Sequence, residues 1–301
     1  RGILHPLALA GAVALFSWGV RKGRSLLPAA VVFSLALWTY TPGRLLVPAM
    51  AALCVALHGS ALRVRGARGR GDLVAAALFV GSLATLSAFW FSDEGMARVG
   101  EEVRGSFDGV GDDLLAYLSP AFLFETGDAN LRHSLPDWGL LLPFEWLTVA
   151  WGVGLCLRMP SRQGALLLGW VVLGVLPAAL TTEGHALRAI GAAPAFTLLS
   201  AAGLGDLLAS VRRVSWRRWL TVGAGLAIAG AGYLSVWRTL HGDYRETSPG
   251  HWQWGMREGI LALEASDRAC RVVSADLFLP HVFILYHGRV PPERYQVRPL
   301  E

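Results

Sequence analysis

The chain has 301 residues, of which 53% are hydrophobic and 16% are charged, and its formal net charge is +5. Soluble domains carry about 25% charged residues, so this composition excludes an ordinary soluble protein and favours a chain that crosses a membrane several times. The positive charge does not indicate nucleic-acid binding, because the arginines stand in short linkers between apolar segments, where they report orientation in a membrane.

Apolar segments recur along most of the chain and predict an all-α polytopic bundle of about eight transmembrane helices. A spanning helix needs about 20 residues. The second and third segments are shorter, and they are either thin spans or a re-entrant pair broken at Pro42 and Gly43. The eight segments are 2–20, 25–41, 45–58, 73–91, 138–157, 164–181, 189–208 and 219–240.

The basic residues predict how the chain is oriented. Arginine and lysine follow the first, third, fifth and seventh segments, whereas the alternate linkers are acidic or weakly charged. Short basic loops stay on the cytoplasmic side. We therefore expect a multi-pass protein of the plasma (inner) membrane, with loop 92–137, the short loop 182–188 and the tail from His241 outside the cell. The chain starts with Arg1 and enters an apolar segment without the features of a signal peptide, and we expect further helices upstream.

Two domains follow from this pattern: a helix bundle, 1–240, and an extracytoplasmic C-terminal module, 241–301. In the module, 255–266 favours a helix, while 271–274 and 282–286 are β-branched or aromatic and favour short strands. We therefore predict a small α+β module. In the long loop, the acidic half 92–113 has helical apolar spacing and predicts an amphipathic helix on the membrane surface.

The second half of the long loop places Asn130, Arg132 and His133 just before a spanning segment. Arginine offers a planar, permanently charged donor fork, and histidine can donate or titrate. These residues suit a phosphate at the level of the lipid headgroups. The alternative is a membrane-anchoring arginine that contacts headgroups without specificity.

The short loop places Glu183, His185 and Arg188 within six residues, between two helices that contain proline. Free N–H groups at a helix start favour an anion. The alternative is a capped helix with an ion pair. A metal held by Glu183 and His185 is weakly supported, because two ligands fall short of a coordination set.

Two further residues are candidates for supporting roles. Glu145 lies about two turns into the fifth apolar segment, where an ionisable group usually faces a polar cavity or a partner. Arg44 follows Pro42 at an outer edge, and it is either a membrane anchor or a headgroup ligand.

Four stretches carry a resemblance to a known family: 37–48, 119–134 with Glu145, 176–190, and Asp243-Tyr244 followed by Trp252. Together they resemble bacterial members of the dolichyl-phosphate-mannose–protein mannosyltransferase superfamily, which includes the aminoarabinose transferases of lipid A. The resemblance implies the GT-C fold. It also implies transfer of a sugar from a polyprenyl-phosphate carrier to a lipid, glycan or protein acceptor at the outer face. The family's catalytic acid lies in the first outer loop, which we expect upstream of residue 1, so the catalytic residue is unknown here.

The mechanism implied by the resemblance is an inverting displacement in which positive groups stabilise the charge on the leaving phosphate. The donor-phosphate candidates are Arg132, His133, His185 and Arg188, supported by Asn130, Glu145, Glu183 and Arg44. We expect membrane lipids as partners and no confident cofactor, with a divalent metal as the alternative. A lipid-linked polysaccharide ligase and a transporter or flippase are competing functions. A transporter predicts polar residues near the middle of the membrane, whereas these cluster near its surface.

Overall fold

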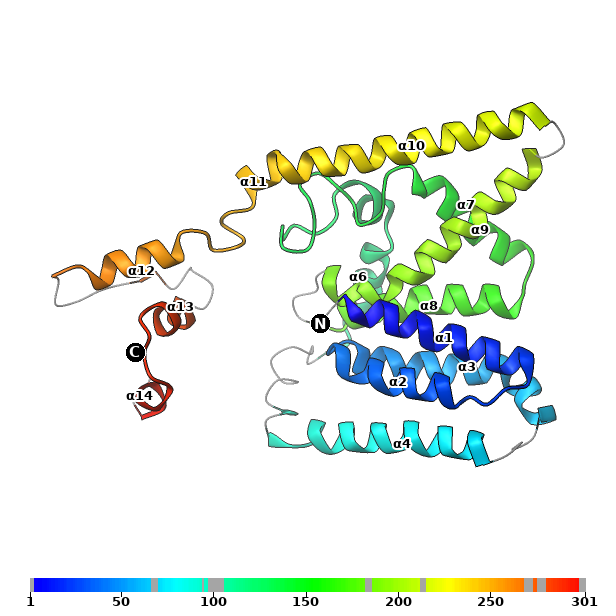
Figure 1. The fold of residues 1–301 in the computed structure, drawn as a ribbon, viewed down its shortest axis with the longest axis horizontal. Helices are drawn as coiled ribbons and strands as arrows, with labels where there is room; N and C mark the ends of the chain where they lie inside the picture. Colours follow the sequence, from blue (N-terminus) through cyan, green and yellow to red (C-terminus); the bar gives the residue numbers. More distant parts are fainter. Residues whose placement is uncertain are drawn as a thin grey trace.

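The computed structural model describes residues 3–65, 70–93, 95–96, 106–181, 186–211, 215–267, 273–274 and 280–297. Within these ranges the chain forms helices and no β-strand. The bundle begins with α1 (Leu4–Lys22), α2 (Leu27–Thr39), α3 (Gly43–Arg65) and α4 (Arg70–Trp90). It continues with α6 (Val110–Tyr117), the π-helical turn η1 (Ala121–Glu125), α7 (Glu145–Arg158), α8 (Arg162–Ala179), the 3₁₀ helix η2 (Ala186–Ala192), α9 (Ala193–Val211) and α10 (Ser215–His241). In Figure 1, α4 and α10 lie at opposite edges of this bundle.

Six stretches of the described chain are long and apolar enough to cross a membrane: Leu4–Lys22, Gly43–Leu62, Gly71–Trp90, Arg162–Ala179, Ala186–Ser210 and Trp219–Thr247. Large apolar side chains on these helices face outward, such as Val80 (61% exposed) and Leu226 (70%). Water does not stabilise such a surface, whereas lipid does. The fold is therefore that of an all-helical protein compatible with several membrane passes.

The number of spans differs from the predicted eight. The helices α2 and α7 have 13 and 14 residues and are shorter than a full span. The prediction that the third segment is short is wrong, because α3 continues past His58 to Arg65 and has 23 residues. The ring of His58 lies 3.0 Å from Cys54 O, within hydrogen-bonding distance. The predicted segment ended at His58 because polar residues follow it, although the helix itself continues for seven more residues to Arg65.

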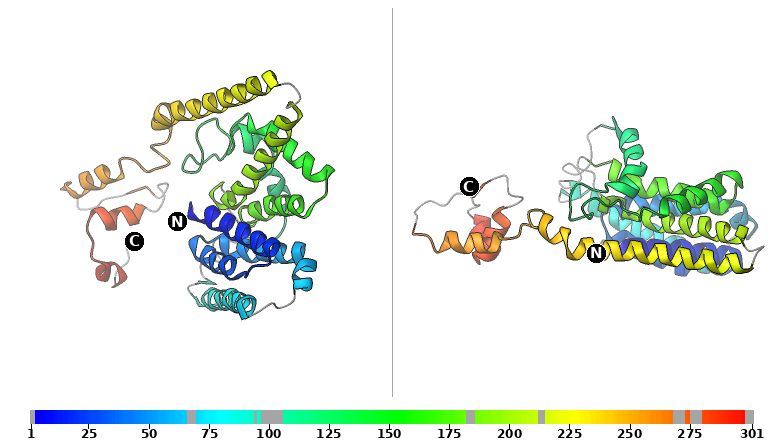
Figure 2. Two further views of the ribbon diagram at one scale, coloured as in Figure 1. Left: turned by 45° about the vertical axis from the view of Figure 1, so that its right-hand side comes forward. Right: turned by 90° about the horizontal axis from the view of Figure 1, so that it is seen from above.

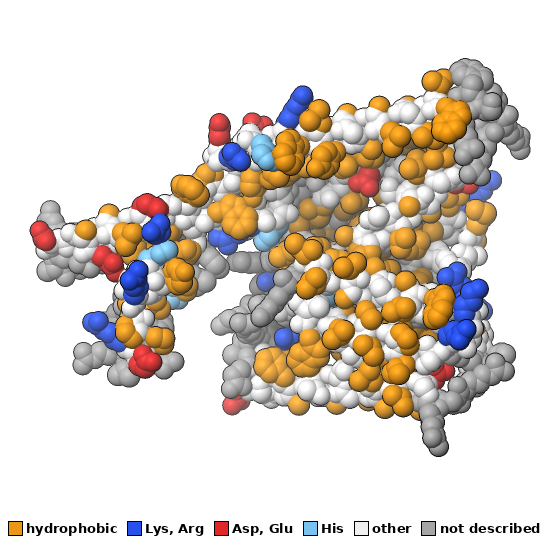
Figure 3. Space-filling model, in the orientation of Figure 1, with side chains coloured by type: hydrophobic (Ala, Val, Ile, Leu, Met, Phe, Trp, Pro, Cys, Tyr) orange, Lys and Arg blue, Asp and Glu red, His pale blue; other side chains and the backbone are white. Residues whose placement is uncertain are grey.

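The helices alternate in direction, so the bundle has two chemically different ends. Arg21, Lys22 and Arg24 mark one of them, the arginine-rich end, which faces right in Figure 3. At this end Arg162 donates a hydrogen bond from Nη2 to Ser60 Oγ at 2.8 Å and so joins the start of α8 to α3. The opposite end, which we call the loop end, carries segment 121–144 and η2.

Small residues allow α7 and α9 to approach closely. A Cβ atom on Gly152 of α7 would collide with Leu199 O, and one on Gly203 of α9 would collide with Thr148 O. Beside this contact the hydroxyls of Thr148 and Ser200 lie 2.7 Å apart. Small residues and an interhelical hydroxyl pair are the usual means of packing helices in lipid, and here they hold together two helices that line the cavity described below.

The C-terminal segment contains α11 (Asp243–Thr247), α12 (Met256–Glu264), α13 (Pro280–His287) and α14 (Pro292–Val297), which extend away from the bundle in Figure 2. The predicted helix 255–266 is confirmed. The predicted strand 282–286 is wrong, because these residues lie in α13. A short apolar run does not distinguish strand from helix, and Pro280 at its start favours a helix. The expected α+β module is therefore not supported.

Two predicted elements fall partly outside the residues that the structure describes. Only 273–274 of the predicted strand 271–274 are described, and they belong to no regular element. Of the predicted surface helix 92–113, residues 94 and 97–105 are outside the described ranges. The described chain resumes at residue 106, and α6 begins four residues later, at Val110.

Candidate functional site

A tight turn at the loop end carries Asn130, Arg132 and His133. Asp128 Oδ1 accepts the backbone N–H of Asn130 at 2.8 Å, and Asn130 Oδ1 accepts that of Arg132 at 3.1 Å. The N–H of His133 bonds to Asn130 O at 2.9 Å. Side chains of Asp and Asn that bond to the backbone two residues onward are a standard means of fixing a turn. The sequence between Asp128 and His133 therefore determines its own local shape.

The same aspartate joins this turn to η2. Asp128 Oδ2 accepts the backbone N–H of Ala186 at 2.7 Å and lies 3.3 Å from His133 Nδ1. The side chains of His133 and Asp128 are 14% and 10% exposed. Arg188 lies two residues beyond Ala186, half-buried on η2. The structure therefore brings together the two segments, 130–133 and 186–188, that carry Arg132, His133 and Arg188.

Residues near the end of α10 and beyond it contact the same turn. Arg132 Nε donates a hydrogen bond to His251 O. Tyr244 Oη donates to Leu131 O at 2.7 Å, and Trp252 Nε1 donates to Tyr244 Oη at 2.7 Å. Two of these hydrogen bonds attach the C-terminal segment to the turn and limit how far Arg132 can move, and the third holds Tyr244 in place.

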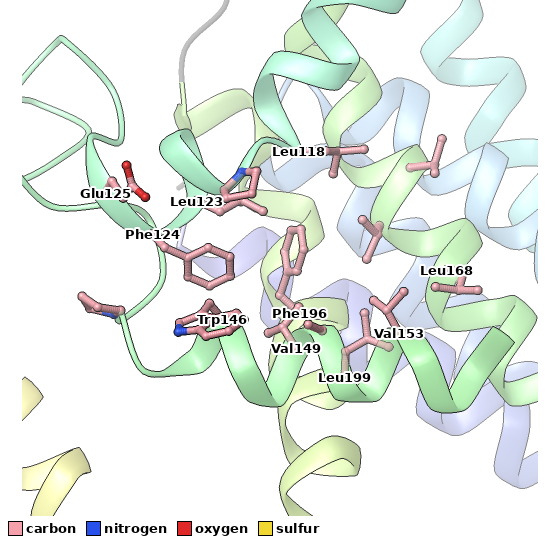
Figure 4. Close-up of a pocket in the computed structure, with 15 residues that line it drawn as sticks. Leu118, Leu123, Phe124, Glu125, Trp146, Val149, Val153, Leu168, Phe196 and Leu199 are labelled. Atoms are coloured by element: carbon pink, nitrogen blue, oxygen red, sulfur yellow. The ribbon is translucent and has the colours of Figure 1, made fainter. Parts of the chain in front are cut away.

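A large apolar cavity lies between η1 and three helices of the bundle. Its volume is about 800 Å³, and its walls come from η1, α7, α8 and α9. Figure 4 shows Phe124, Trp146 and Phe196 around it. Glu125 is the one charged side chain in the lining, and the other lining residues are apolar or aromatic. Such a cavity suits a hydrocarbon chain rather than a polar ligand.

A smaller cavity of about 230 Å³ adjoins the large one and reaches the turn. Leu123 and Phe196 line both cavities. The smaller cavity is lined by His133 and Tyr117 and otherwise by apolar side chains, including Leu187 and others of η2. His133 therefore lies where an apolar chamber meets the polar turn, which is the boundary that an amphipathic ligand would cross.

Of the remaining predicted site residues, Arg44 has a contact of its own, and two lie outside the described residues. Arg44 stacks its guanidinium over the ring of Phe89, with 5.4 Å from Cζ to the ring centroid. Glu183 and His185 are outside the described residues. Elsewhere in the described ranges, no group of three or more His, Cys, Asp and Glu side chains could coordinate a metal.

The expected position of Glu145 is wrong. It does not lie two turns into a helix, because residues 138–144 are irregular and α7 begins at Glu145 itself. Its Oε2 accepts the backbone N–H of Leu142 at 2.9 Å. A carboxylate at a helix N-terminus is stabilised by the free N–H groups there. Glu145 thus anchors the start of α7.

Sequence reasoning gave no role to Asp128, although its side chain joins the turn to η2. The available signal was its position two residues before Asn130, directly after Gly127, which has a φ of 62°. Gly followed by Asp in a turn predicts a side chain that bonds to the backbone. The partner in η2, 58 residues away, could not be inferred from that spacing.

Comparisons with protein-family models, curated proteins and solved structures give no match for this chain. The chemistry of the site therefore follows from its own residues. Two arginine-bearing segments meet at one histidine–carboxylate pair, and apolar cavities lie beside them. This combination fits a lipid with a phosphate headgroup.

Proposed function

We propose that the protein is a membrane glycosyltransferase that moves a sugar from a polyprenyl-phosphate carrier to an acceptor on the extracytoplasmic face. The observation that carries this proposal is the hydrogen bond from the Ala186 N–H to Asp128, because it joins the two segments that hold the candidate phosphate ligands, beside an apolar cavity. The resemblance to the mannosyltransferase superfamily supports it. A lipid, a glycan or a protein can be the acceptor in such a reaction.

Each part of the donor has a matching part of the site. The isoprenoid chain occupies the cavity of about 800 Å³ between α7, α8 and α9. The phosphate lies against Arg132, His133 and Arg188, whose charge and N–H groups stabilise it. The sugar then faces the aqueous side of the turn, where the acceptor approaches.

The reaction is an inverting displacement at the anomeric carbon. A base takes the proton of the acceptor hydroxyl, and the carrier phosphate leaves. The positively charged side chains of Arg132 and Arg188 act mainly on the leaving phosphate, because negative charge accumulates there in the transition state. The residues of the turn and η2 therefore serve catalysis as well as binding.

A transfer assay tests the proposal. Protein expressed from the complete gene is reconstituted in liposomes with radiolabelled polyprenyl-phosphate sugars, and incorporation of the sugar into extracted acceptors is measured. Arg132→Ala and Arg188→Ala should reduce transfer by about 10²-fold or more without changing expression. Arg162→Ala is the matched control, because Arg162 lies at the arginine-rich end and bonds to Ser60. Equal transfer by all three variants would contradict the proposed phosphate site.

A further inference from the structure

Asp206 places a carboxylate on the outer surface of a helix that is long and apolar enough to cross a membrane. It lies in α9, within the candidate span Ala186–Ser210, and it is exposed. Trp151 Nε1 of α7 donates a hydrogen bond to Asp206 Oδ2 at 3.0 Å, and Trp151 is itself 45% exposed. No lysine or arginine of the described chain pairs with this carboxylate. A charged group inside a membrane is costly and usually has a partner of opposite charge, which the described residues do not supply.

The depth of Asp206 determines which kind of cation can reach it. It lies five residues before Val211, where α9 ends, so about 7 Å of helix separates it from that end at the usual rise per residue. An aspartate side chain is too short to carry its charge that far toward the lipid headgroups. Lysine and arginine carry their charge at the end of a long apolar stem, so a helix that stands beside α9 can deliver a cation at this depth. The geometry therefore favours a basic side chain on a neighbouring helix over the amine of a lipid headgroup.

The bundle leaves space for such a helix beside Asp206. The helix α10 packs against α9, and Figure 1 shows it along the edge of the bundle. Within its described span, Trp219–Thr247, the most apolar stretch contains no buried residue, and Leu220 near its start is 61% exposed. A Cβ atom on Gly205 of α9 or on Gly223 of α10 would meet no atom within 4 Å. Small residues on an exposed apolar surface let another helix approach closely in lipid.

We propose that this surface, formed by Trp151, Gly205 and Asp206 with the adjoining part of α10, binds a membrane-spanning helix of a partner protein that carries a lysine or arginine. The basic group forms an ion pair with Asp206. Trp151 holds the carboxylate through its N–H, and the face of its exposed ring attracts the same cation. Asp206 and Trp151 line neither of the two cavities described above, so the inference goes beyond the proposed function and does not depend on it.

A second copy of the chain fits this surface less well than a partner protein does. All copies have the same orientation in the membrane, so only the basic residues of the arginine-rich end could approach Asp206. Within the described helices these residues stand at or next to helix ends, such as Lys22 at the end of α1 and Arg162 at the start of α8. A cation that matches a carboxylate inside the span is therefore better supplied by a different chain.

Designed membrane-spanning peptides test the charge preference directly. Fluorescently labelled protein, expressed from the complete gene, is reconstituted in phosphatidylcholine liposomes with labelled Leu/Ala peptides that carry Lys, Leu or Glu five residues from one end. Energy transfer between the two labels measures binding. We expect the Lys peptide to bind about 10-fold more tightly than the Leu peptide, and the Glu peptide to bind most weakly. Asp206→Asn keeps an oxygen for the Trp151 N–H but removes the charge, so it should abolish this preference.

The matched control is Asp267→Asn, which removes one negative charge from an exposed residue of the C-terminal segment. This variant should bind the three peptides as the wild type does. Equal binding of the Lys and Leu peptides by the wild type, or an unchanged preference in Asp206→Asn, would overturn the inference.

Two further measurements distinguish the other occupants of this surface. If phosphatidylethanolamine added to the liposomes removes the preference of the wild type for the Lys peptide, the surface binds a lipid amine and the partner-helix inference is overturned. If a dilution series shows dimers of the wild type that Asp206→Asn does not form, the occupant is a second copy, which also overturns it. A preference for the Lys peptide that persists in this lipid, with the same self-association in both proteins, supports a partner helix. Success or failure of sugar transfer leaves these results unchanged.

Discussion

Asp128 Oδ2 accepts the backbone N–H of Ala186 at 2.7 Å, and this bond joins a loop between α6 and α7 to the 3₁₀ helix that follows α8. The side chain of Asp128 is 10% exposed, so the bond forms in a mostly dry environment. A buried N–H that loses its acceptor costs about 1–3 kcal/mol. The geometry of the site therefore depends on one residue that has no phosphate-binding role itself.

Replacing Asp128 by alanine should loosen η2. Asp128→Ala removes the acceptor of the Ala186 N–H, whereas Asp128→Asn retains an oxygen at the same position. We expect hydrogen exchange across 186–190 to accelerate about 10-fold or more in the alanine variant, the equivalent of about 1.4 kcal/mol. The asparagine variant should exchange much more slowly than the alanine variant. Identical exchange in both variants and the wild type would show that this bond does not restrain η2.

The close contact between α7 and α9 leads to a prediction about the stability of the bundle. A Cβ on Gly203 would collide with Thr148 O, whereas a Cβ on Gly205, in the same helix, meets no atom within 4 Å. Gly203→Ala should therefore lower the thermal unfolding temperature in detergent by several degrees, because the helices must separate. Gly205→Ala should leave it unchanged or raise it, since alanine favours helix over glycine. A similar change in both variants would contradict the close approach of α7 and α9.

The proposed orientation can be tested by labelling single cysteines. In a background without native cysteines, Ala129→Cys places a thiol on the exposed part of the turn, and Lys22→Cys places one at the arginine-rich end. A maleimide that cannot cross membranes should label position 129 in intact cells and position 22 only after permeabilisation, because basic loops stay inside. The reverse pattern would place the phosphate site in the cytoplasm and exclude the proposed reaction at the outer face.

Much of the fold could be predicted from hydropathy, because lipid requires long apolar helices and the sequence displays them directly. The errors have identifiable causes. The helix α3 continues through polar residues after His58, where an apolar count ends. Segment 138–144 is apolar yet irregular, with Leu141 N–H bonded to Leu123 O at 2.8 Å instead of to its own segment. Hydropathy reports burial, and it does not report which backbone groups pair.

The site was predictable only in part. Arg132, His133 and Arg188 were identifiable because charged residues beside spanning segments are costly without a role. Their proximity rests on Asp128 and Ala186, and a backbone N–H leaves no signal in the sequence. The resemblance singled out Tyr244 and Trp252, but their contacts could not be predicted from the sequence: the Tyr244 hydroxyl bonds to Leu131 O in the turn, and the Trp252 indole bonds to Tyr244.

Photo-crosslinking with a polyprenyl-phosphate sugar that carries a diazirine on its isoprenoid chain tests the central claim most directly. The probe is added to the reconstituted protein, irradiated, and mapped by mass spectrometry. We predict labelling on the walls of the large cavity, around Trp146 and Phe196, and its loss in Ala150→Trp, which fills that space. Leu147→Trp is the matched control, because Leu147 is 49% exposed and does not line the cavity. Equal labelling of both variants, or labelling spread over the outer faces of the bundle, would contradict a lipid-phosphate sugar bound at this site.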